Sequence, residues 1–461
     1  MVNNMTITNK KECDLLLSIN IFLLFFEIVF SYIFNSNFFM LLFAIHLMIA
    51  LILENNLTNQ FILYLSFISY KQITILRGTN LPNVLTIVGF VFCVKCLIVL
   101  WNFVKKKDIE KFKFIIFGIL VFCIYYFVGV YFNKGVSFYY LSVLQTFLIV
   151  MIGVMTIKQI NVIKIYKYYL VMFCFSIVLG VCRYKISALD EVLRFATVDG
   201  ANRFTGLAWD TNFLGLQCCC NIGILVSLLE QKKDNKVFYS ICLLFVLLAG
   251  LMTLSKMYIL GLGVLFVMWL LTSKTQMKFK IILLAIIIVG VVLLYFSLPS
   301  DNSIKVLMNR FVRIFAENES LDKITTGRWD IWKAYITDWS STPWKILFGS
   351  GLGYPIVSGT VFQCHSVYVE FLYAFGLIGV TLFIVVISAC IAFGRNSNKN
   401  FYANKYDRLV ARNQKIKENA INWLGIIALL ICYIALGATT ETNSIVMFLI
   451  SCFVLDINLG K

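Results

Sequence analysis

The chain of 461 residues is 60% hydrophobic and only 14% charged, and it carries a formal net charge of +17. Soluble domains average about 45–50% apolar and about 25% charged residues, so this composition excludes an ordinary soluble protein. Apolar runs of roughly 17–25 residues, the length that crosses a bilayer, recur along nearly the whole chain. We therefore predict an all-α polytopic fold, with residues 1–461 forming a single integral membrane domain.

Hydropathy predicts about fourteen transmembrane helices. In chain order the predicted spans are 14–34, 37–53, 58–76, 82–101, 113–132, 138–157, 166–182, 210–229, 238–254, 256–272, 279–297, 366–393, 421–438 and 444–458. The span at 58–76 has the weakest signal, because it contains Lys71 and Gln72.

The positions of lysine and arginine orient these spans. If the N-terminus is cytoplasmic, basic clusters at 105–113, 274–280 and 395–417 all fall on the cytoplasmic side. The positive-inside rule then places both termini in the cytoplasm. This assignment requires the span at 58–76, since the N-terminus would otherwise change sides. The positive net charge then reflects topology and attraction to anionic membrane lipid, and does not indicate nucleic acid.

Two long segments become extracytoplasmic, residues 183–209 and 298–365. Loops longer than about 12–15 residues are uncommon unless they are functional or disordered. In the second segment, apolar residues recur at helical spacing over 303–316, which predicts an amphipathic helix lying on the membrane surface. We expect a large structured loop here. Its surface helix would gate lipid entry, with Arg313 as its phosphate contact.

A second loop helix is predicted around TTGRWDIWKAY, residues 325–335. Thr326 is the expected N-cap, and Pro343 is expected to end the helix. The apolar residues at helical spacing are Trp329, Trp332, Ile336 and Trp339. Arg328 falls in the first turn, where the helix dipole and free N–H groups favour an anion. It therefore either meets a bound anion, or stacks on tryptophan or pairs with Asp330.

The following stretch is FGSGLGYPIVSGTVFQCHSVYVEFLYAFGLIG, residues 348–379. Its first glycines predict a tight turn and close approach of a ligand to backbone N–H groups, but the strand and lysine of a phosphate loop are missing. His365 falls where the chain re-enters the membrane from outside. Glu370 either orients a substrate hydroxyl or pairs with a polar group inside the bundle. His46 lies within a predicted span, and we assign it no role.

The shorter loop leads into RFTGLAWDTNFLG, residues 203–215, and a later outer turn contains Ser255 and Lys256. Arg203, Lys256 and Arg328 are thus three cations on one side of the membrane, accompanied by a histidine. Such a set suits an amphipathic anion such as a lipid diphosphate. Each charge-assisted contact would contribute about 1.5–3 kcal/mol.

Four motifs in order carry a family resemblance: RFTGxxxDxNFLG, an LSK turn, TGRWxxWxxxxxxWxxxPxxxxxGSGLG, and HSxYxEFLYxFGLIG. Together they resemble the O-antigen polymerase and O-antigen ligase superfamily, which includes polymerases of capsule and exopolysaccharide repeat units. The motifs cover roughly residues 200–380. The first half of the chain is similar only in being multi-spanning.

The resemblance implies a metal-independent membrane glycosyltransferase without a cofactor. It would take a glycan from undecaprenyl diphosphate at the outer face of the bacterial cytoplasmic membrane. Arg328 matches the essential loop arginine and His365 the essential histidine, while Arg203 and Lys256 match further basic positions. The chain departs from the pattern at Lys256, where arginine is common, and at Ser366, where asparagine is common.

The predicted function is polymerisation of lipid-linked repeat units into O-antigen or capsular polysaccharide. A diphosphate leaves without a protonated carboxylic acid, so cations should stabilise it while His365 accepts the proton of the attacking hydroxyl. The scarcity of soluble sequence favours a polymerase over a ligase, which stays an alternative. A flippase is a further alternative, disfavoured because the four prolines lie at span edges or in loops. The expected partners are membrane lipid, a flippase and a chain-length regulator.

Overall fold

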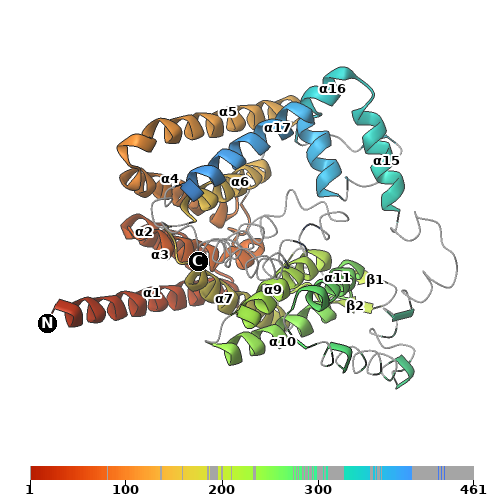
Figure 1. Ribbon diagram of the computed structural model, residues 1–461, viewed down its shortest axis with the longest axis horizontal. Coiled ribbons are helices and arrows are strands. Elements are labelled where there is room, and N and C mark those ends of the chain that lie inside the picture. The colour runs from red at the N-terminus through yellow and green to blue at the C-terminus, as the bar shows by residue number, and fades with distance from the viewer. Residues whose placement is uncertain are drawn as a thin grey trace, which may run out of the picture. The chain divides into compact units, whose positions relative to one another are not determined.

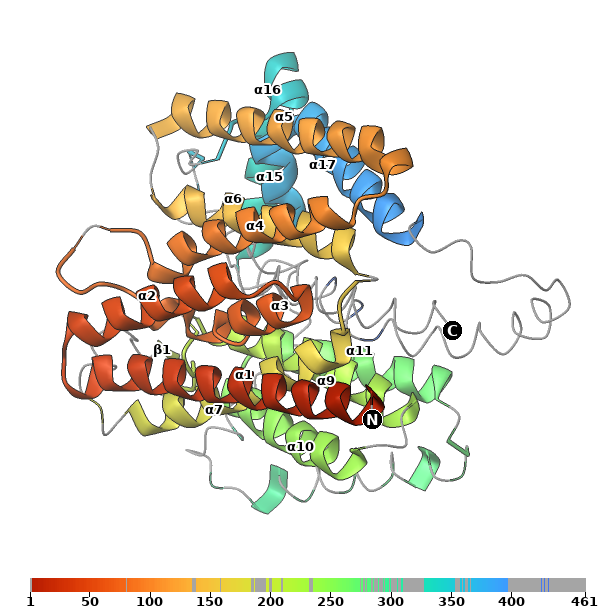
Figure 2. The ribbon, with the colours of Figure 1, turned by 90° about the vertical axis from the view of Figure 1, so that its left-hand side faces the viewer.

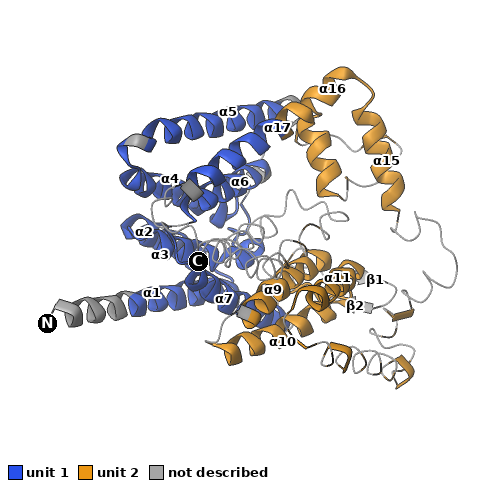
Figure 3. Ribbon diagram, viewed as in Figure 1, with its two compact units in different colours: residues 1–194, 381–399 blue, residues 195–380, 400–461 orange. Residues whose placement is uncertain are grey.

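The computed structural model describes residues 2–273 and 327–396 apart from short gaps, the longest being residues 187–195. Scattered positions from 275 to 309 and residues 424, 427 and 430 are also described. The chain forms two compact units (Figure 3): unit 1 contains residues 1–194 and 381–399, and unit 2 contains residues 195–380 and 400–461. Helices make up most of the described part of each unit (Figure 1).

Unit 1 is a helical bundle. Its helices are α1 (Val2–Ile33), α2 (Asn37–Leu53), α3 (Leu57–Leu65), α4 (Val84–Phe103), α5 (Ile109–Lys134), α6 (Phe138–Thr156) and α7 (Val162–Cys182), with short 3₁₀ helices at Ile68–Ile73 and Lys106–Asp108. Helix α2 packs against α1 and α4, α4 packs against α6, and α3 packs against α7 (Figure 2). The end of α17 (Val367–Asn396) also belongs to unit 1, where Phe383 contacts Phe122 and Phe147.

Many of the described helices are long and apolar enough to cross a membrane. Six qualify by length and composition: Asp14–Ile33, Val84–Phe103, Ile109–Tyr131, Val162–Cys182, Thr211–Glu230 and Val367–Gly394. Four shorter apolar helices are Asn37–Leu53, Tyr140–Thr156, Lys236–Met252 and Lys256–Thr272. Large apolar side chains such as Phe22, Phe117 and Ile124 are exposed on outward faces. Helices that are apolar on all sides require lipid around them, so the chain is a multi-pass membrane protein.

The predicted count of transmembrane helices is only partly reproduced. In the described part of the chain, the six long and four shorter helices coincide with ten predicted spans. The predicted spans at 279–297, 421–438 and 444–458 lie largely or wholly outside the described residues. The surface helix at 303–316 also falls almost entirely outside them, as do residues 310–326 of the 298–365 loop, whereas residues 327–352 of that loop are described.

The predicted span at 58–76 is not one continuous helix. Helix α3 ends at Leu65, and after a short turn the chain continues as the 3₁₀ helix Ile68–Ile73. All residues of α3 and most of the 3₁₀ helix are buried. The prediction of one continuous helix over 58–76 is therefore wrong. A segment enclosed by other helices can break its helical hydrogen bonding, because neighbouring protein groups replace the lost partners.

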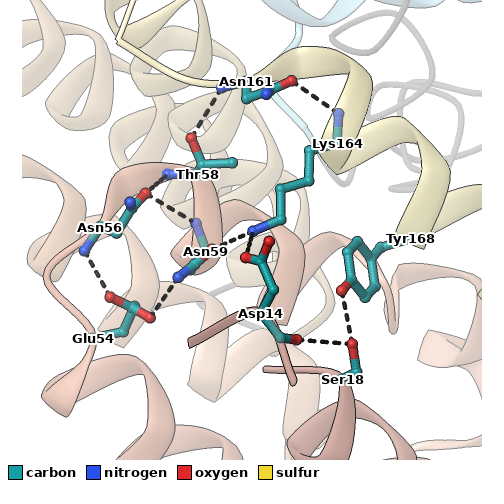
Figure 4. Close-up of polar contacts among 9 residues, drawn as sticks. All are labelled: Asp14, Ser18, Glu54, Asn56, Thr58, Asn59, Asn161, Lys164 and Tyr168. Carbon is teal, nitrogen blue, oxygen red and sulfur yellow. Dashed lines mark hydrogen bonds and ion pairs between the residues drawn. The ribbon is translucent and has the colours of Figure 1, made fainter. Parts of the chain in front are cut away.

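One end of unit 1 is joined by a polar network (Figure 4). The Lys164 ammonium group donates to Asp14 Oδ1 at 2.6 Å and to Asn59 Oδ1 at 3.2 Å. The backbone N–H of Asn161 donates to the Thr58 hydroxyl at 2.9 Å. These contacts hold the start of α3 beside the start of α7 and beside Asp14, where the apolar part of α1 begins.

A second set of contacts joins the end of α1 and the start of α2 to the turn that follows the 3₁₀ helix Ile68–Ile73. The backbone N–H of Arg77 donates to Asn37 Oδ1 and its carbonyl accepts from Asn37 Nδ2, both at 3.0 Å. The Arg77 guanidinium lies 4.1 Å from the ring centroid of Tyr32, near the end of α1. Between Leu57 and Arg77 the chain therefore passes along the apolar part of α1, from beside Asp14 to beside Tyr32. The predicted orientation of the spans stays a prediction.

Polar side chains inside unit 1 pair with one another, as an apolar environment requires. His46 Nδ1 lies 2.9 Å from Glu27 Oε1 and links α2 to α1. Lys71, which is buried, donates to the Ser142 hydroxyl of α6. The charged residue that weakened the sequence signal thus has a protein partner.

Unit 2 contains two strands and the remaining helices. Its elements are β1 (Ala196–Val198), β2 (Ala201–Arg203), α9 (Thr211–Gln231), α10 (Lys236–Met252), α11 (Lys256–Thr272), α15 (Arg328–Trp339), α16 (Pro343–Phe348) and the first part of α17. The strands form an antiparallel hairpin in which Ala196 pairs with Arg203, a small addition to the predicted all-α fold. Helix α9 packs against α10 and α11.

Helix α17 is kinked at Gly376, and the residues after α16 dock on this kink. Gly376 has φ 61° and ψ −175°, which interrupts the helical hydrogen bonds. The carbonyl groups of Tyr373 and Ala374 instead accept from the backbone N–H groups of Ser350 at 2.7 Å and Gly351 at 2.9 Å. The glycine-rich turn therefore approaches another part of the backbone closely. The N–H groups of Ser350 and Gly351 are therefore occupied by α17 and do not meet a ligand, whereas Gly353 lies outside the described residues.

Gly349 and Gly376 are required at this joint. A Cβ added to Gly349 would lie 2.5 Å from the Ala374 carbonyl oxygen, and one added to Gly376 would lie 2.3 Å from the Gly349 nitrogen. Both residues also have positive φ angles, 76° and 61°. L-residues adopt such angles only with strain. A side chain at either position would therefore both collide with neighbouring backbone atoms and strain the local backbone.

We expect Gly349→Ala to destabilise the protein strongly, since backbone strain alone costs about 1–3 kcal/mol and the steric overlap adds to it. Gly263→Ala is the matched control, because a Cβ at Gly263 meets nothing within 4 Å and alanine favours a helix by up to about 1 kcal/mol. Thermal unfolding in detergent, followed by size-exclusion chromatography, measures both. Equal melting temperatures for the two variants would contradict the proposed role of the joint.

Candidate functional site

Four of the six predicted site residues lie in the described part of the chain. Arg203, Lys256 and Arg328 are half-buried, and Glu370 is buried. His365 and Arg313 lie outside the described residues, so their roles stay predictions.

Arg203 ends strand β2 and is held by two segments. Its Nε donates to the carbonyl oxygen of Thr253 at 3.0 Å, and its NH2 group donates to Asn212 Oδ1 at 3.3 Å. The next residue, Phe204, donates its backbone N–H to the Met252 carbonyl at 3.1 Å. The arginine that leads the RFTG motif is therefore fixed against the end of α10 and the start of α9.

The turn before Lys256 is tightly constrained. Leu254 adopts a left-handed φ of 50° although it is not glycine, a conformation that persists only where surrounding contacts enforce it. Ser255 is fully buried; its hydroxyl donates to Asn212 Oδ1 at 2.7 Å and accepts from the Tyr258 backbone N–H. Lys256 follows as the first residue of α11, at the positive end of the helix dipole. The structure thus brings the turns of Arg203 and Lys256 together through Asn212.

Arg328 is the first residue of α15, as its position in the sequence predicts. The expected N-cap Thr326 is wrong: Gly327 occupies that position with φ 81° and makes no side-chain cap. A glycine reaches this angle without the strain that a Cβ would cause. The first N–H groups of α15 therefore receive no oxygen from the N-cap side chain.

Two opposing effects act on the pKa of Arg328. Burial lowers the pKa of its guanidinium from the ordinary 12.5, and the negative charge of Asp210 opposes this change. Within the part of the chain that the structure describes, Arg328 neither stacks on tryptophan nor pairs with Asp330. Both structural explanations considered for Arg328 therefore fail there. The acid that acts on its charge is Asp210, in the RFTGLAWDTNFLG segment.

Helix α15 is held to α16 and α17 through Asp338. The Lys345 ammonium group lies 2.8 Å from Asp338 Oδ2, and the Tyr373 hydroxyl donates to the same oxygen at 2.6 Å. The buried Tyr335 ring packs edge-on against Tyr373, with centroids 4.9 Å apart. Pro343 does not end α15, which stops at Trp339, but occupies the first turn of α16. These contacts fix the helix that presents Arg328.

Glu370 lies in the first turn of α17 and is buried. Burial is the main cause that raises the pKa of Tyr335, and the charge of Glu370 adds to it. The buried carboxylate is therefore close enough to Tyr335 of α15 to affect its pKa. The residues on either side of His365 in the sequence, Cys364 and Ser366, are both buried.

Sequence reasoning did not assign several residues that shape this region. Asp210 and Asn212 are visible in the motif RFTGxxxDxNFLG, as an acid and an amide two positions apart at the start of a helix. That pattern indicates a cap, and Asp210 Oδ1 does accept from the Asn212 backbone N–H at 2.6 Å. No local signal reveals that Asn212 also binds Arg203 and Ser255. Asp338 and Tyr373 likewise come from separate motifs.

Comparison with known proteins gives one match. A family model described as O-antigen ligase matches residues 241–384. This range contains Lys256, Arg328 and Glu370, whereas Arg203 precedes it. No curated protein and no solved structure matches the chain. The family expected from the motifs is confirmed by this match.

We expect the Asp338 contact to stabilise the protein at neutral pH and to weaken in acid. Partial burial raises its pKa, but hydrogen bonds from Lys345 and Tyr373 more than offset this and hold the pKa below the ordinary 3.8. A lowered pKa in the folded state contributes stability above pH 3.8, which is lost as the pH falls through the folded value.

Asp338→Asn should therefore lower the melting temperature at pH 7 and reduce the further loss of stability as the pH falls below 3.8. Asp330→Asn is the control, because Asp330 is an exposed acid on the same helix. Parallel pH profiles for wild type and Asp338→Asn would show that the contact contributes nothing.

Proposed function

We propose that this chain, whose residues 241–384 belong to the O-antigen polymerase and ligase superfamily, polymerises lipid-linked oligosaccharide repeat units. The donor and the acceptor would each be carried by undecaprenyl diphosphate at the outer face of a bacterial cytoplasmic membrane. The product would be an O-antigen or capsular polysaccharide. No metal or cofactor takes part in the proposed reaction.

The main observation behind the proposal is that cations from separate sequence motifs are connected to one polar turn, which adjoins apolar helices. Arg203 and the turn before Lys256 share Asn212, and Asp210, which caps the same helix, acts on Arg328. A half-buried guanidinium loses hydration and gains most from an anion that replaces the water. A lipid diphosphate supplies such an anion while its tail stays in the bilayer. The apolar helices α9 and α17 of the same unit suit that tail.

The proposed reaction is a displacement at the anomeric carbon of the donor glycan. The bond from that carbon to the diphosphate oxygen breaks, and its electron pair stays on the departing undecaprenyl diphosphate. The hydroxyl oxygen of the acceptor sugar forms the new glycosidic bond, and its proton passes to His365. Arg328, with Arg203 and Lys256, stabilises the charge on the leaving group, an effect worth about 3–4 kcal/mol for one well-placed donor.

Further parts of the proposal concern residues beyond this turn. Glu370 would contact the glycan, and Arg313 would meet the phosphate on a surface helix that gates lipid entry. Both termini would be cytoplasmic. A flippase that supplies repeat units and a chain-length regulator are the proposed partners.

The ligase alternative differs only in the acceptor, which would be lipid A core or protein. We favour the polymerase because spans occupy most of the sequence and leave little for a soluble acceptor-binding part. A flippase gains some support from the broken segment at 57–73 and the kink at Gly376, since transporters often use discontinuous helices. However, the carbonyl groups of Tyr373 and Ala374 freed by that kink already accept backbone N–H groups. They are therefore not open to a substrate.

We expect Arg328→Ala and His365→Ala to abolish long polysaccharide chains and to leave single lipid-linked repeat units on the outer face. Removing one charge-stabilising group typically slows a reaction about 10²–10³-fold. Lys333→Ala is the matched control, because Lys333 is an exposed cation on the same helix as Arg328. Mass spectrometry of undecaprenyl-linked oligosaccharides and a gel of surface polysaccharide measure the outcome in cells lacking the native gene.

The same measurement separates the alternatives. Long lipid-linked chains that are made but never transferred indicate a ligase, and repeat units trapped on the inner face indicate a flippase. Normal chains in both variants, at normal protein levels, would rule out the assigned roles of Arg328 and His365.

A further inference from the structure

Asn212 lies where three segments of the proposed site meet. Its Oδ1 accepts a hydrogen bond from Arg203 at 3.3 Å and another from the Ser255 hydroxyl at 2.7 Å. Its backbone N–H donates to Asp210 Oδ1 at 2.6 Å. One residue therefore connects strand β2, the first turn of α9 and the turn before α11.

These partners fix the direction of the amide. A guanidinium has donors only, so the atom that faces Arg203 must be the amide oxygen. Two donors fill the two lone pairs of that oxygen, and Nδ2 is left with two N–H groups on the other branch. Among the residues that the structure describes, none accepts a hydrogen bond from Nδ2. The side chain is half-buried, so this donor group is not fully enclosed.

We propose, on the basis of the function proposed above, that Asn212 binds the diphosphate of the lipid-linked donor. Its Oδ1 holds Arg203 and Ser255 in place, and its Nδ2 donates to a phosphate oxygen that Arg203 also binds. Diphosphate oxygens only accept hydrogen bonds at neutral pH, so both groups match the ligand. An amide is suited to this position because it accepts on one branch and donates on the other.

The variant Asn212→Asp distinguishes a direct contact with the diphosphate from a merely structural role. A carboxylate still accepts from Arg203 and Ser255, but it cannot donate and it repels a diphosphate. Asn212→Ala instead removes the support of Arg203. Asn161→Asp is the matched control: Asn161 caps α7 through the backbone N–H of Lys164, and aspartate caps a helix as well as asparagine.

The experiment measures the affinity of purified full-length protein for undecaprenyl diphosphate in detergent, with repeat-unit polymerisation and melting temperature measured in parallel. We expect Asn212→Asp to bind at least about tenfold more weakly than wild type, because the variant loses a charge-assisted hydrogen bond and its carboxylate repels the diphosphate. KM for the donor should rise in proportion, at an unchanged melting temperature. Asn161→Asp should match wild type in all three measurements.

Two results would overturn the inference in different ways. If Asn212→Asp binds like wild type while Asn212→Ala binds weakly, Asn212 only supports Arg203, and the proposed function stands without the direct contact. If wild type neither binds undecaprenyl diphosphate nor polymerises repeat units, the proposed function fails as well. Should Asn212→Asp not fold, Asn212→Thr replaces it, because the shorter threonine side chain keeps a hydroxyl acceptor and has no N–H group to donate to a phosphate. The same tenfold loss is then expected.

Discussion

A charged or polar group that leaves water must find other partners, and this requirement shapes both units. In unit 1, Glu27 pairs with His46, and Lys71 donates to Ser142. In unit 2, Arg203 is bound by a carbonyl and an amide oxygen. Unsatisfied groups in hydrocarbon cost several kcal/mol each, so each of these pairs removes a cost that the apolar surroundings would otherwise impose. The apolar helices supply the surroundings in which each pair matters.

The same requirement explains why the candidate site lies at helix ends. Lys256 and Arg328 are each the first residue of a helix, where the dipole is unfavourable to a cation. A bound anion offsets the unfavourable interaction between such a cation and the helix dipole. Local cost of this kind is typical of functional sites, where the rest of the structure must enforce it. Leu254, held in a left-handed conformation before Lys256, shows the same enforcement.

The sequence was informative wherever one local pattern decides the structure. Apolar runs of membrane length predict helices such as α4 and α7, and tryptophans at helical spacing predict α15. The break after Leu65 was missed because hydropathy measures polarity and not helical continuity. Thr326 was a reasonable cap by residue type, but the positive φ of Gly327 decided where the helix begins.

The charged residues of the candidate site could be predicted from the sequence, but the hydrogen bonds that connect them could not. Arg203 and Arg328 could be chosen because cations in extracytoplasmic motifs suggest an anionic substrate. The link through Asn212 depends on the turn at 253–255, which lies far away in the sequence. Hydrogen-bond partners of that kind are set by tertiary structure, so one motif considered alone does not reveal them.

The joint between the glycine turn and the kink of α17 is made of main-chain atoms. Ser350 and Gly351 donate backbone N–H groups to backbone carbonyls, and the required residues, Gly349 and Gly376, have no side chains. This joint itself therefore needs no side chains, while Asp338 and Tyr335 add separate side-chain contacts to α17. Proteins built on this frame can exchange loop side chains while keeping the joint. Loop side chains away from these contacts can thus vary without a new way of attaching the loop.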